Sequence, residues 1–139
     1  MNTIRSAALV LALFASAAAG AADLKLRVDD VKSAEGKVML AVYDSADSFL
    51  KKPAKTVSVA AATGTVNVLI KDLPPGHYGI ALFHDANGNG KMDRNAMGIP
   101  LEDYAFSNNA QGMMGPPSFE QARFAVPADG GAGIVISLR

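Results

Sequence analysis

A run of oxygen-bearing side chains, HDANGNGKMD at residues 84–93, is the part of the sequence best suited to chemistry. Asp85, Asn87 and Asn89 occupy every second position, with glycines between and after them. This spacing lets a coiled backbone turn three carboxylate or amide oxygens towards one point, as in the calcium loop of an EF-hand. Gly90 falls at the sixth position, where such a loop turns sharply. Hard oxygen donors suit a hard cation, so the predicted cofactor is Ca²⁺.

The rest of the run departs from the full EF-hand pattern. Lys91 would offer its main-chain carbonyl and Asp93 stands at the ninth position, but the twelfth, normally a glutamate, is Ala96. Ca²⁺ takes about six to eight oxygens, so waters, or a carboxylate from Glu102 or Asp103 folding back, would complete the shell, and Glu102 is the candidate closing ligand. The predicted ligands are Asp85, Asn87, Asn89, Lys91, Asp93 and Glu102. With so few charges we expect a weak site, with a Kd of about 10⁻⁴ to 10⁻³ M. The alternative is a tight polar turn, since Asn, Asp and Gly also favour turns.

Two other chemistries use the same region. A hydrolase would employ the loop carboxylates with His84 as general base, but the sequence has no cysteine and no nucleophile or phosphate-binding motif. His84 shares the parity of Ile80 and Leu82, so it is expected to point inwards and to be satisfied by a loop carbonyl. Four methionines, Met92, Met97, Met113 and Met114, could bind Cu(I), although flexible gap-filling under a loop is the commoner use of methionine. We predict no enzymatic activity and keep hydrolysis and copper binding as alternatives.

The elements that would position this loop are short runs with period-two alternation of apolar residues. They are residues 24–28, 37–44, 55–61, 65–73, 77–85, 122–126 and 134–138. Such alternation predicts strands with one buried face. About seven strands in a chain of this length favour an all-β, two-sheet sandwich, with a small barrel as the alternative.

One long loop, from about residue 85 to 117, interrupts the predicted strands. A loop of that length inside a compact domain is often functional. Phe106, Met113, Met114 and Phe119 could present a contact surface for an unknown protein or glycan partner. Burial of these side chains would mark the loop as structural, and joint exposure of two or more would mark a contact site.

The first 22 residues have the build of a signal peptide. Arg5 precedes a short apolar run, and small residues follow it, so cleavage after Ala21 or Ala22 is expected. The remaining domain, residues 23–139, carries 12 basic and 13 acidic residues once Arg5 is removed, and it has no cysteine. This near-neutral charge argues against nucleic acid as a partner. The sequence has no second apolar segment, so we expect no membrane insertion of the mature chain. The expected localisation is periplasmic or secreted.

Three stretches resemble an uncharacterised exported bacterial family, domain of unknown function 2141. They are LPPGHYGIALFHDANGNGKMD, GIPLEDYAFSNNA and PPSFEQARF. The residues on family motif positions are His84, Asp85, Asn87, Asn89, Gly90, Asp93 and Glu102. The resemblance implies an immunoglobulin-like or transthyretin-like sandwich, an export signal and no established activity. It also implies that residues 85–102 form one ordered unit, with Glu102 near Asp85 and Asn108 or Asn109 bonded to loop backbone.

Overall fold

The computed structural model describes residues 20–139 of the chain. The predicted signal peptide lies outside the described residues, apart from its last three positions. The first strand begins at Ala22, whose side chain is already part of the core. Within the described part of the chain, no helix is long and apolar enough to cross a membrane.

Eight strands and two short helical turns make up the described chain. The strands are β1 (Ala22–Val31), β2 (Lys37–Tyr43), β3 (Lys55–Ala60), β4 (Gly64–Leu73), β5 (Gly76–Asp85), β6 (Tyr104–Phe106), β7 (Phe124–Val126) and β8 (Gly133–Ser137). The helical turns are η1 (Ser107–Asn109), a 3₁₀ turn, and α1 (Phe119–Ala122). All seven predicted runs form strands, so the all-β prediction is confirmed.

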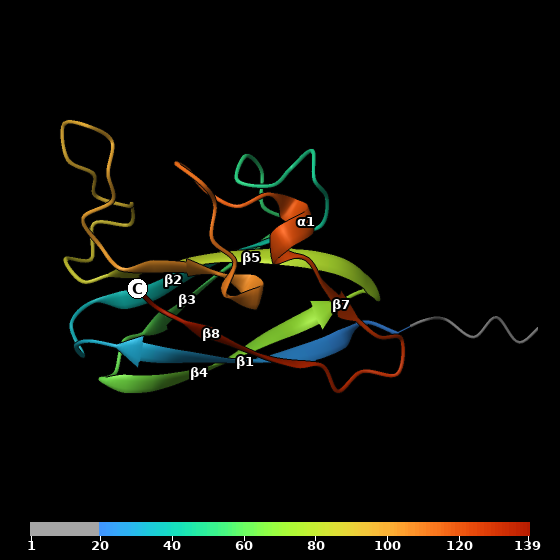
Figure 1. Cartoon of the computed structure of the whole chain (residues 1–139). Helices are drawn as coiled ribbons and strands as arrows, with labels where there is room; N and C mark the ends of the chain where they lie inside the picture. Colours follow the sequence, from blue (N-terminus) through green and yellow to red (C-terminus); the bar gives the residue numbers. More distant parts are fainter. Residues whose placement is uncertain (1–19) are drawn as a thin grey trace, which may run out of the picture.

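The strands form two sheets packed face to face (Figure 1). The smaller sheet has the order β4-β1-β8, with β1 antiparallel to β4 and parallel to β8. The larger sheet has the order β3-β2-β5-β6, and β7 pairs with the first residues of β5, from Gly76 to Tyr78. The two-sheet sandwich is therefore confirmed. The immunoglobulin-like or transthyretin-like assignment stays a prediction.

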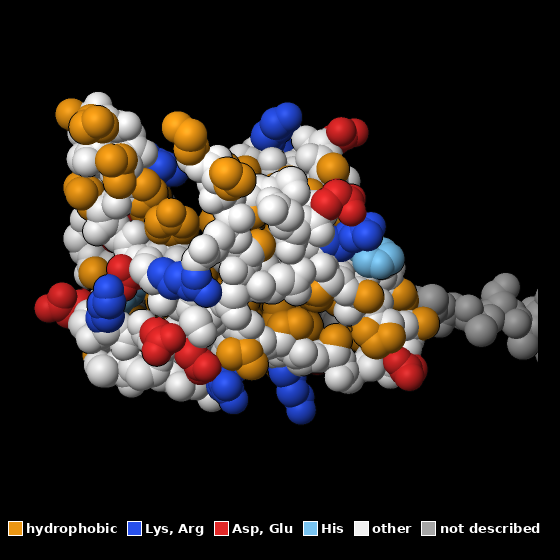
Figure 2. Space-filling view, in the orientation of Figure 1, with side chains coloured by type: hydrophobic (Ala, Val, Ile, Leu, Met, Phe, Trp, Pro, Cys, Tyr) orange, Lys and Arg blue, Asp and Glu red, His pale blue; other side chains and the backbone are white. Residues whose placement is uncertain are grey.

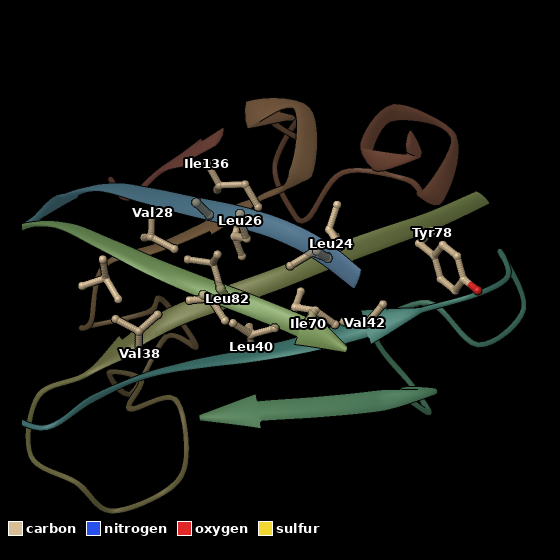
Figure 3. Packing of buried hydrophobic residues seen from close by; sticks show 14 of the residues in the cluster. Leu24, Leu26, Val28, Val38, Leu40, Val42, Ile70, Tyr78, Leu82 and Ile136 are labelled. Atoms are coloured by element: carbon tan, nitrogen blue, oxygen red, sulfur yellow. The ribbon is translucent and has the colours of Figure 1, made fainter. Parts of the chain in front are cut away.

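Alternation along the strands builds the core between the sheets (Figure 3). In β1 every second residue from Ala22 to Val28 is buried, and the charged residues between them face outwards. The fully or almost fully buried side chains include Leu24, Leu26, Val28, Val38, Val42, Ile70, Ile80 and Ile136. Burial of each such side chain contributes roughly 1.5–3 kcal/mol, which makes the register of both sheets unambiguous.

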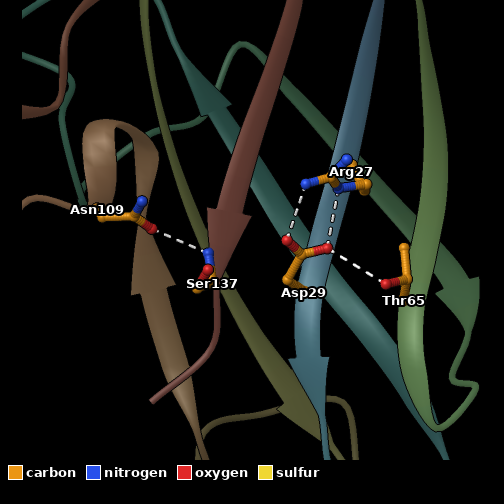
Figure 4. Close-up of polar contacts among 5 residues, drawn as sticks. All are labelled: Arg27, Asp29, Thr65, Asn109 and Ser137. Carbon is orange, nitrogen blue, oxygen red and sulfur yellow. Dashed lines mark hydrogen bonds and ion pairs between the residues drawn. The ribbon is translucent and has the colours of Figure 1, made fainter.

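Polar contacts tie the smaller sheet together at its surface and join it to η1 (Figure 4). The Arg27 guanidinium lies 3.0 Å from Asp29 Oδ1, and the Thr65 hydroxyl donates to the same oxygen from the neighbouring strand. Asn109 Oδ1 accepts from the Ser137 amide of β8 at 2.9 Å. Because the Arg27 pair is exposed it contributes little energy, whereas the Asn109 contact fixes the end of β8 against the larger sheet.

The bend before β5 is held by a tyrosine. The Tyr78 hydroxyl donates to the Pro74 carbonyl at 2.5 Å. Burial and the nearby charge of Asp44 raise the pKa of Tyr78, so the hydroxyl keeps the proton it donates. A tyrosine bonded back to the chain a few residues upstream is a feature of Greek-key sandwiches. This bond sets the direction in which β5 runs towards the candidate site.

The long loop predicted at residues 85–117 is not continuous. β6 pairs Tyr104–Phe106 with Ala81–Phe83 of β5, and η1 follows directly. The expectation of one uninterrupted loop was therefore wrong. Three residues are too few to show an alternating pattern, and the pairing partner lies more than twenty positions away. The region divides into a first loop, residues 86–103, and a second, residues 110–117.

A second apolar cluster covers part of the outer face of the larger sheet. Its buried members are Tyr43, Phe49, Phe106, Phe119 and Ala122. A Cβ at Gly79 would lie 3.1 Å from the Phe49 ring and 3.2 Å from the Phe119 ring. Glycine at this strand position therefore lets the two rings settle directly on the backbone of β5.

We predict that Gly79→Ala destabilises the fold, because the added methyl group must push the two rings apart. The expected loss in free energy of unfolding is about 1–3 kcal/mol, measured by urea denaturation. The control is Gly133→Ala in β8, where the nearest atom, Lys25 O, would lie at an ordinary 3.6 Å. That variant should stay within about 0.5 kcal/mol of the parent. Equal stability of the two variants would contradict the proposed packing.

Candidate functional site

The candidate site begins where β5 ends, and a turn from another strand pair presses against it. Gly36, in the turn before β2, has φ of +66°, and a Cβ there would lie 2.0 Å from the main-chain oxygen of Asp85. No other residue fits this approach without moving the backbone. The turn also supplies the Glu35 carbonyl, which lies 2.7 Å from Nε2 of His84. The start of the loop is thus fixed by local packing before any loop side chain contributes.

Asp85 is the most buried polar residue of the site. Only 1% of its surface is exposed. Its Oδ2 accepts the Gly90 amide at 2.8 Å, which points the carboxylate into the loop. Its Oδ1 is buried and has no hydrogen-bond partner among the described residues. A buried oxygen without a partner is unfavourable by about 1–3 kcal/mol, and more when it is charged.

The two asparagines form successive turns that converge on Asp93. Asn87 Oδ1 accepts the Asn89 amide at 3.2 Å, and Asn89 Oδ1 accepts the Lys91 amide at 3.1 Å. Their side-chain nitrogens donate to the two oxygens of Asp93, at 2.5 Å from Asn87 and 2.7 Å from Asn89. The alternate spacing therefore turns the two amide nitrogens towards Asp93, while both Oδ1 atoms bond to the loop backbone; convergence of the oxygens on one cation stays a prediction.

Glu102, two residues before β6, returns to the beginning of the loop. Its Oε2 accepts the Ala86 amide at 3.2 Å, and its Oε1 accepts the Asp93 amide at 2.9 Å. A main-chain bond from the His84 amide to the Asp103 carbonyl holds the two chain segments together beside it. One carboxylate thus joins both ends of the loop, and this is the position that the sequence assigned to a closing ligand.

These contacts join Asn87, Asn89 and Glu102 to Asp93, whereas the Asp85 carboxylate bonds to the Gly90 amide and Lys91 takes part only through its main chain. Its amide donates to Asn89, and the residue is exposed. No lysine or arginine among residues 20–139 forms an ion pair with Asp85, Asp93 or Glu102. Three carboxylates therefore lie in one loop without a paired cation, which makes the site electronegative.

The carboxylates do not form a compact acidic cluster. Within the described residues, no three His, Cys, Asp or Glu side chains gather in a way that would hold a metal ion. A cation bound here would need the asparagine amides and main-chain carbonyls as well. Such neutral oxygens suit Ca²⁺ far better than a transition metal.

Residues 94–101 continue the loop as a short arm. Arg94 and Pro100 form an isolated bridge across it. At its tip Asn95 Oδ1 accepts the amides of Met97 and Ile99, at 2.9 and 3.0 Å. Asn95 was not among the predicted site residues, although an asparagine three residues before a glycine is a usual turn signal. The arm therefore has its own internal hydrogen bonds.

His84 is a buried, hydrogen-bonded histidine. It is 5% exposed, and its ring is bonded to the turn at Glu35. An inward-pointing, hydrogen-bonded ring is what the alternation of inward and outward side chains along the strand predicted for His84. The hydrolase alternative needs an accessible base, and His84 does not present one.

The side chains considered for a contact surface divide into two groups. Phe106 and Phe119 are buried in the outer cluster and are structural. Met113 and Met114 are 95% and 107% exposed, and Met97 in the arm is 84% exposed. Gap-filling under the loop is therefore the wrong explanation for these three methionines. Met113 and Met114 are exposed together, and both a contact surface there and copper binding stay predictions.

The asparagines that follow β6 bond to backbone, but to that of α1 and β8 and not to the loop backbone that was expected. Asn108 Nδ2 donates to the carbonyls of Gln121 and Arg123, and Asn109 binds β8. Ser107, which is fully buried, accepts the Ile80 amide and donates to the Ala122 carbonyl. This motif is structural: it fastens α1 and β8 to the larger sheet.

Comparison with known proteins gave one family match. The family model described as "Uncharacterized protein conserved in bacteria (DUF2141)" matches residues 26–133. A search of curated proteins and a search of solved structures each found no match. The match runs from β1 to the first residue of β8 and contains every residue of the candidate site. The chain therefore belongs to the DUF2141 family.

Proposed function

We propose that this protein is a noncatalytic, exported binding module whose loop at residues 85–102 takes up Ca²⁺. The observation that carries the proposal is the Asp85 carboxylate, with one oxygen bonded to Gly90 and the other buried without a partner. A hard cation is the natural partner for such an oxygen. In the calcium loops that this run resembles, the first aspartate supplies a ligand oxygen.

We expect the remaining predicted ligands to share the cation. Asn87 and Asn89 each use one lone pair of Oδ1 for a turn hydrogen bond, which leaves the second for an ion. Asp93 and Glu102 add charge, and the carbonyl of Lys91 adds a neutral oxygen. Together with Asp85 they offer the six protein ligands that Ca²⁺ requires at minimum.

The same contacts explain why binding should be weak. The amide nitrogens of Asn87 and Asn89 face Asp93, so an ion must displace or rotate these groups before it can use Asp93. Glu102 must keep its two main-chain hydrogen bonds while it binds. A Kd of about 10⁻⁴ to 10⁻³ M suits a module outside the cytoplasm, in line with the proposed periplasmic or secreted location.

A calcium titration of Asp85→Asn tests the central ligand. The substitution keeps the shape and the Gly90 hydrogen bond but removes the charge. By calorimetry the parent should bind Ca²⁺ in the millimolar range, and tenfold excess over Kd should add about 1.4 kcal/mol to its stability. Asp85→Asn should lose at least about tenfold in affinity. In EDTA its stability should match or exceed that of the parent, because a buried charge has been removed.

The matched control is Asp129→Asn, in an exposed loop far along the chain, which should bind as the parent does. Absence of both heat and stabilisation at millimolar Ca²⁺ in the parent would sink the proposal. So would an undiminished calcium response in Asp85→Asn.

Amide hydrogen exchange separates the structural role of Glu102 from its role as a ligand. In EDTA, Glu102→Gln leaves one acceptor oxygen for two amides, so the Ala86 or Asp93 amide should exchange faster. The expected loss of protection is about 1–3 kcal/mol in local opening free energy. Adding Ca²⁺ should slow exchange in this loop for the parent and much less for the variant. Glu120→Gln, at an exposed helix position, is the control. Unchanged exchange at both amides would contradict the bonding described for Glu102.

A further inference from the structure

A groove on the outer face of the larger sheet takes no part in the proposed calcium chemistry. Its floor is formed by Met39, Ala41, Ala81 and Phe83, and its walls include Ile99 of the arm and Met114 of the second loop. We call it the outer groove. Its volume is about 960 Å³, at the upper end of the range for sites that bind small molecules. In Figure 1 the arm rises on one side of the sheet, and the second loop and α1 lie over the other part.

The outer groove exists because the aromatic cluster covers only part of this face. Ala41 and Ala81 lie next to that cluster, and because their side chains are small, the sheet surface between the walls is hollowed. The walls expose large apolar groups to water: Met97 is 84%, Ile99 53% and Met114 107% exposed. Figure 2 shows hydrophobic atoms on both raised segments, with a hollow between them. Apolar side chains gathered around a hollow mark a binding site.

The charge of the lining selects the kind of ligand. Among the described residues that line the outer groove, Arg94 is charged and no aspartate or glutamate is present. Arg94 Nη1 donates to the Gly98 carbonyl at 3.0 Å, which holds the guanidinium against the arm. A guanidinium has five N–H donors, so most of them remain for an acidic group.

We propose that the outer groove binds an amphiphile with an apolar body and an anionic head, such as a fatty acid. The apolar body lies on the sheet between the arm and the second loop, and the head pairs with Arg94. Four methionines, Met39, Met92, Met97 and Met114, line the groove. Their flexible, polarisable side chains can adapt to an apolar chain of variable shape.

Two macromolecular occupants fit less well. The floor is a sheet face, whose main-chain groups are already paired within the sheet, so an extended peptide would find no strand edge to pair with. A second copy would bring a broad surface against two raised segments, which keep it away from the floor. A narrow apolar ligand reaches the floor without meeting the walls.

The methionine methyl groups give a direct test. Protein labelled at these methyls is titrated with dodecanoate below the concentration of micelle formation and followed by NMR. EDTA is present throughout, because hydrogen bonds within the chain hold the arm without a cation. The resonances of Met39, Met92, Met97 and Met114 should shift. Met113, which is exposed but does not line the groove, should not shift. Dodecyltrimethylammonium, with the same chain and a cationic head, should bind about tenfold more weakly.

Two pairs of variants locate the binding contacts. Met114→Glu places an acid in the groove wall and should weaken dodecanoate binding about tenfold, whereas Met113→Glu next to it should stay within about twofold of the parent. Arg94→Gln should remove most of the preference for the anionic head, and Arg27→Gln, on the other sheet, should keep it. The four side chains are at the surface, so each variant should fold.

Several results would overturn the proposal. They are absence of shifts at the groove methionines, equal affinity for the two head groups, or equal loss in the two methionine variants. Shifts of the same methyls on raising the protein concentration without any amphiphile would show that a second copy occupies the groove instead. Shifts confined to the groove methionines with head-group preference would support it. None of these outcomes depends on Ca²⁺, so they are separable from the calcium titration.

Discussion

The position of β5, whose inner face is buried in the core and whose outer face is partly covered, is the constraint on which the rest of the structure depends. Its inner face carries Ile80 and Leu82 into the core, and its outer face carries Gly79 beneath the aromatic cluster. Three strands, β2, β6 and β7, pair with it along its length. A strand held in this way has no freedom to slip. Asp85, the last residue of β5, therefore has a fixed and buried position.

That fixed position explains the build of the loop after it. A carboxylate buried at a strand end needs hydrogen-bond donors. The Gly90 amide supplies one for Oδ2 of Asp85, and Oδ1 is left without a partner among the described residues. The other loop carboxylates accept hydrogen bonds and are less buried. The loop thus resembles a calcium loop in the positions it fills, and differs in bonding Asp93 to two amides. This difference, more than the missing glutamate at Ala96, is the physical reason to expect weak binding.

The extent to which sequence predicted this structure follows from the range over which each pattern acts. Alternation is local, so the strands from residue 24 to residue 85 and the two near the C-terminus could be located from period-two runs. Counting calcium ligands suggested that a later carboxylate folds back, and the family resemblance favoured Glu102, because nothing local shows where a glutamate seventeen positions after Asp85 will fold. β6 is too short to leave a pattern, and the parallel pairing of β1 with β8 joins opposite ends of the domain. The methionines were misjudged for a related reason. Composition cannot tell a side chain that fills a gap from one that borders an open groove, since the difference lies in which distant residues cover the sheet.

The arm gives the two proposed sites a common boundary. Asp93 belongs to the proposed calcium loop and Arg94, the next residue, lines the outer groove, so adjacent residues would contact ligands of opposite charge. The bridge between Arg94 and Pro100 and the bonds from Asn95 give the arm a shape of its own, and Glu102 fastens its base. A cation that tightens the base would restrict movement of the groove wall without touching the groove. Under the two proposals, one ordered arm beside β5 would serve both a cation and an amphiphile, on a scaffold whose core takes part in neither.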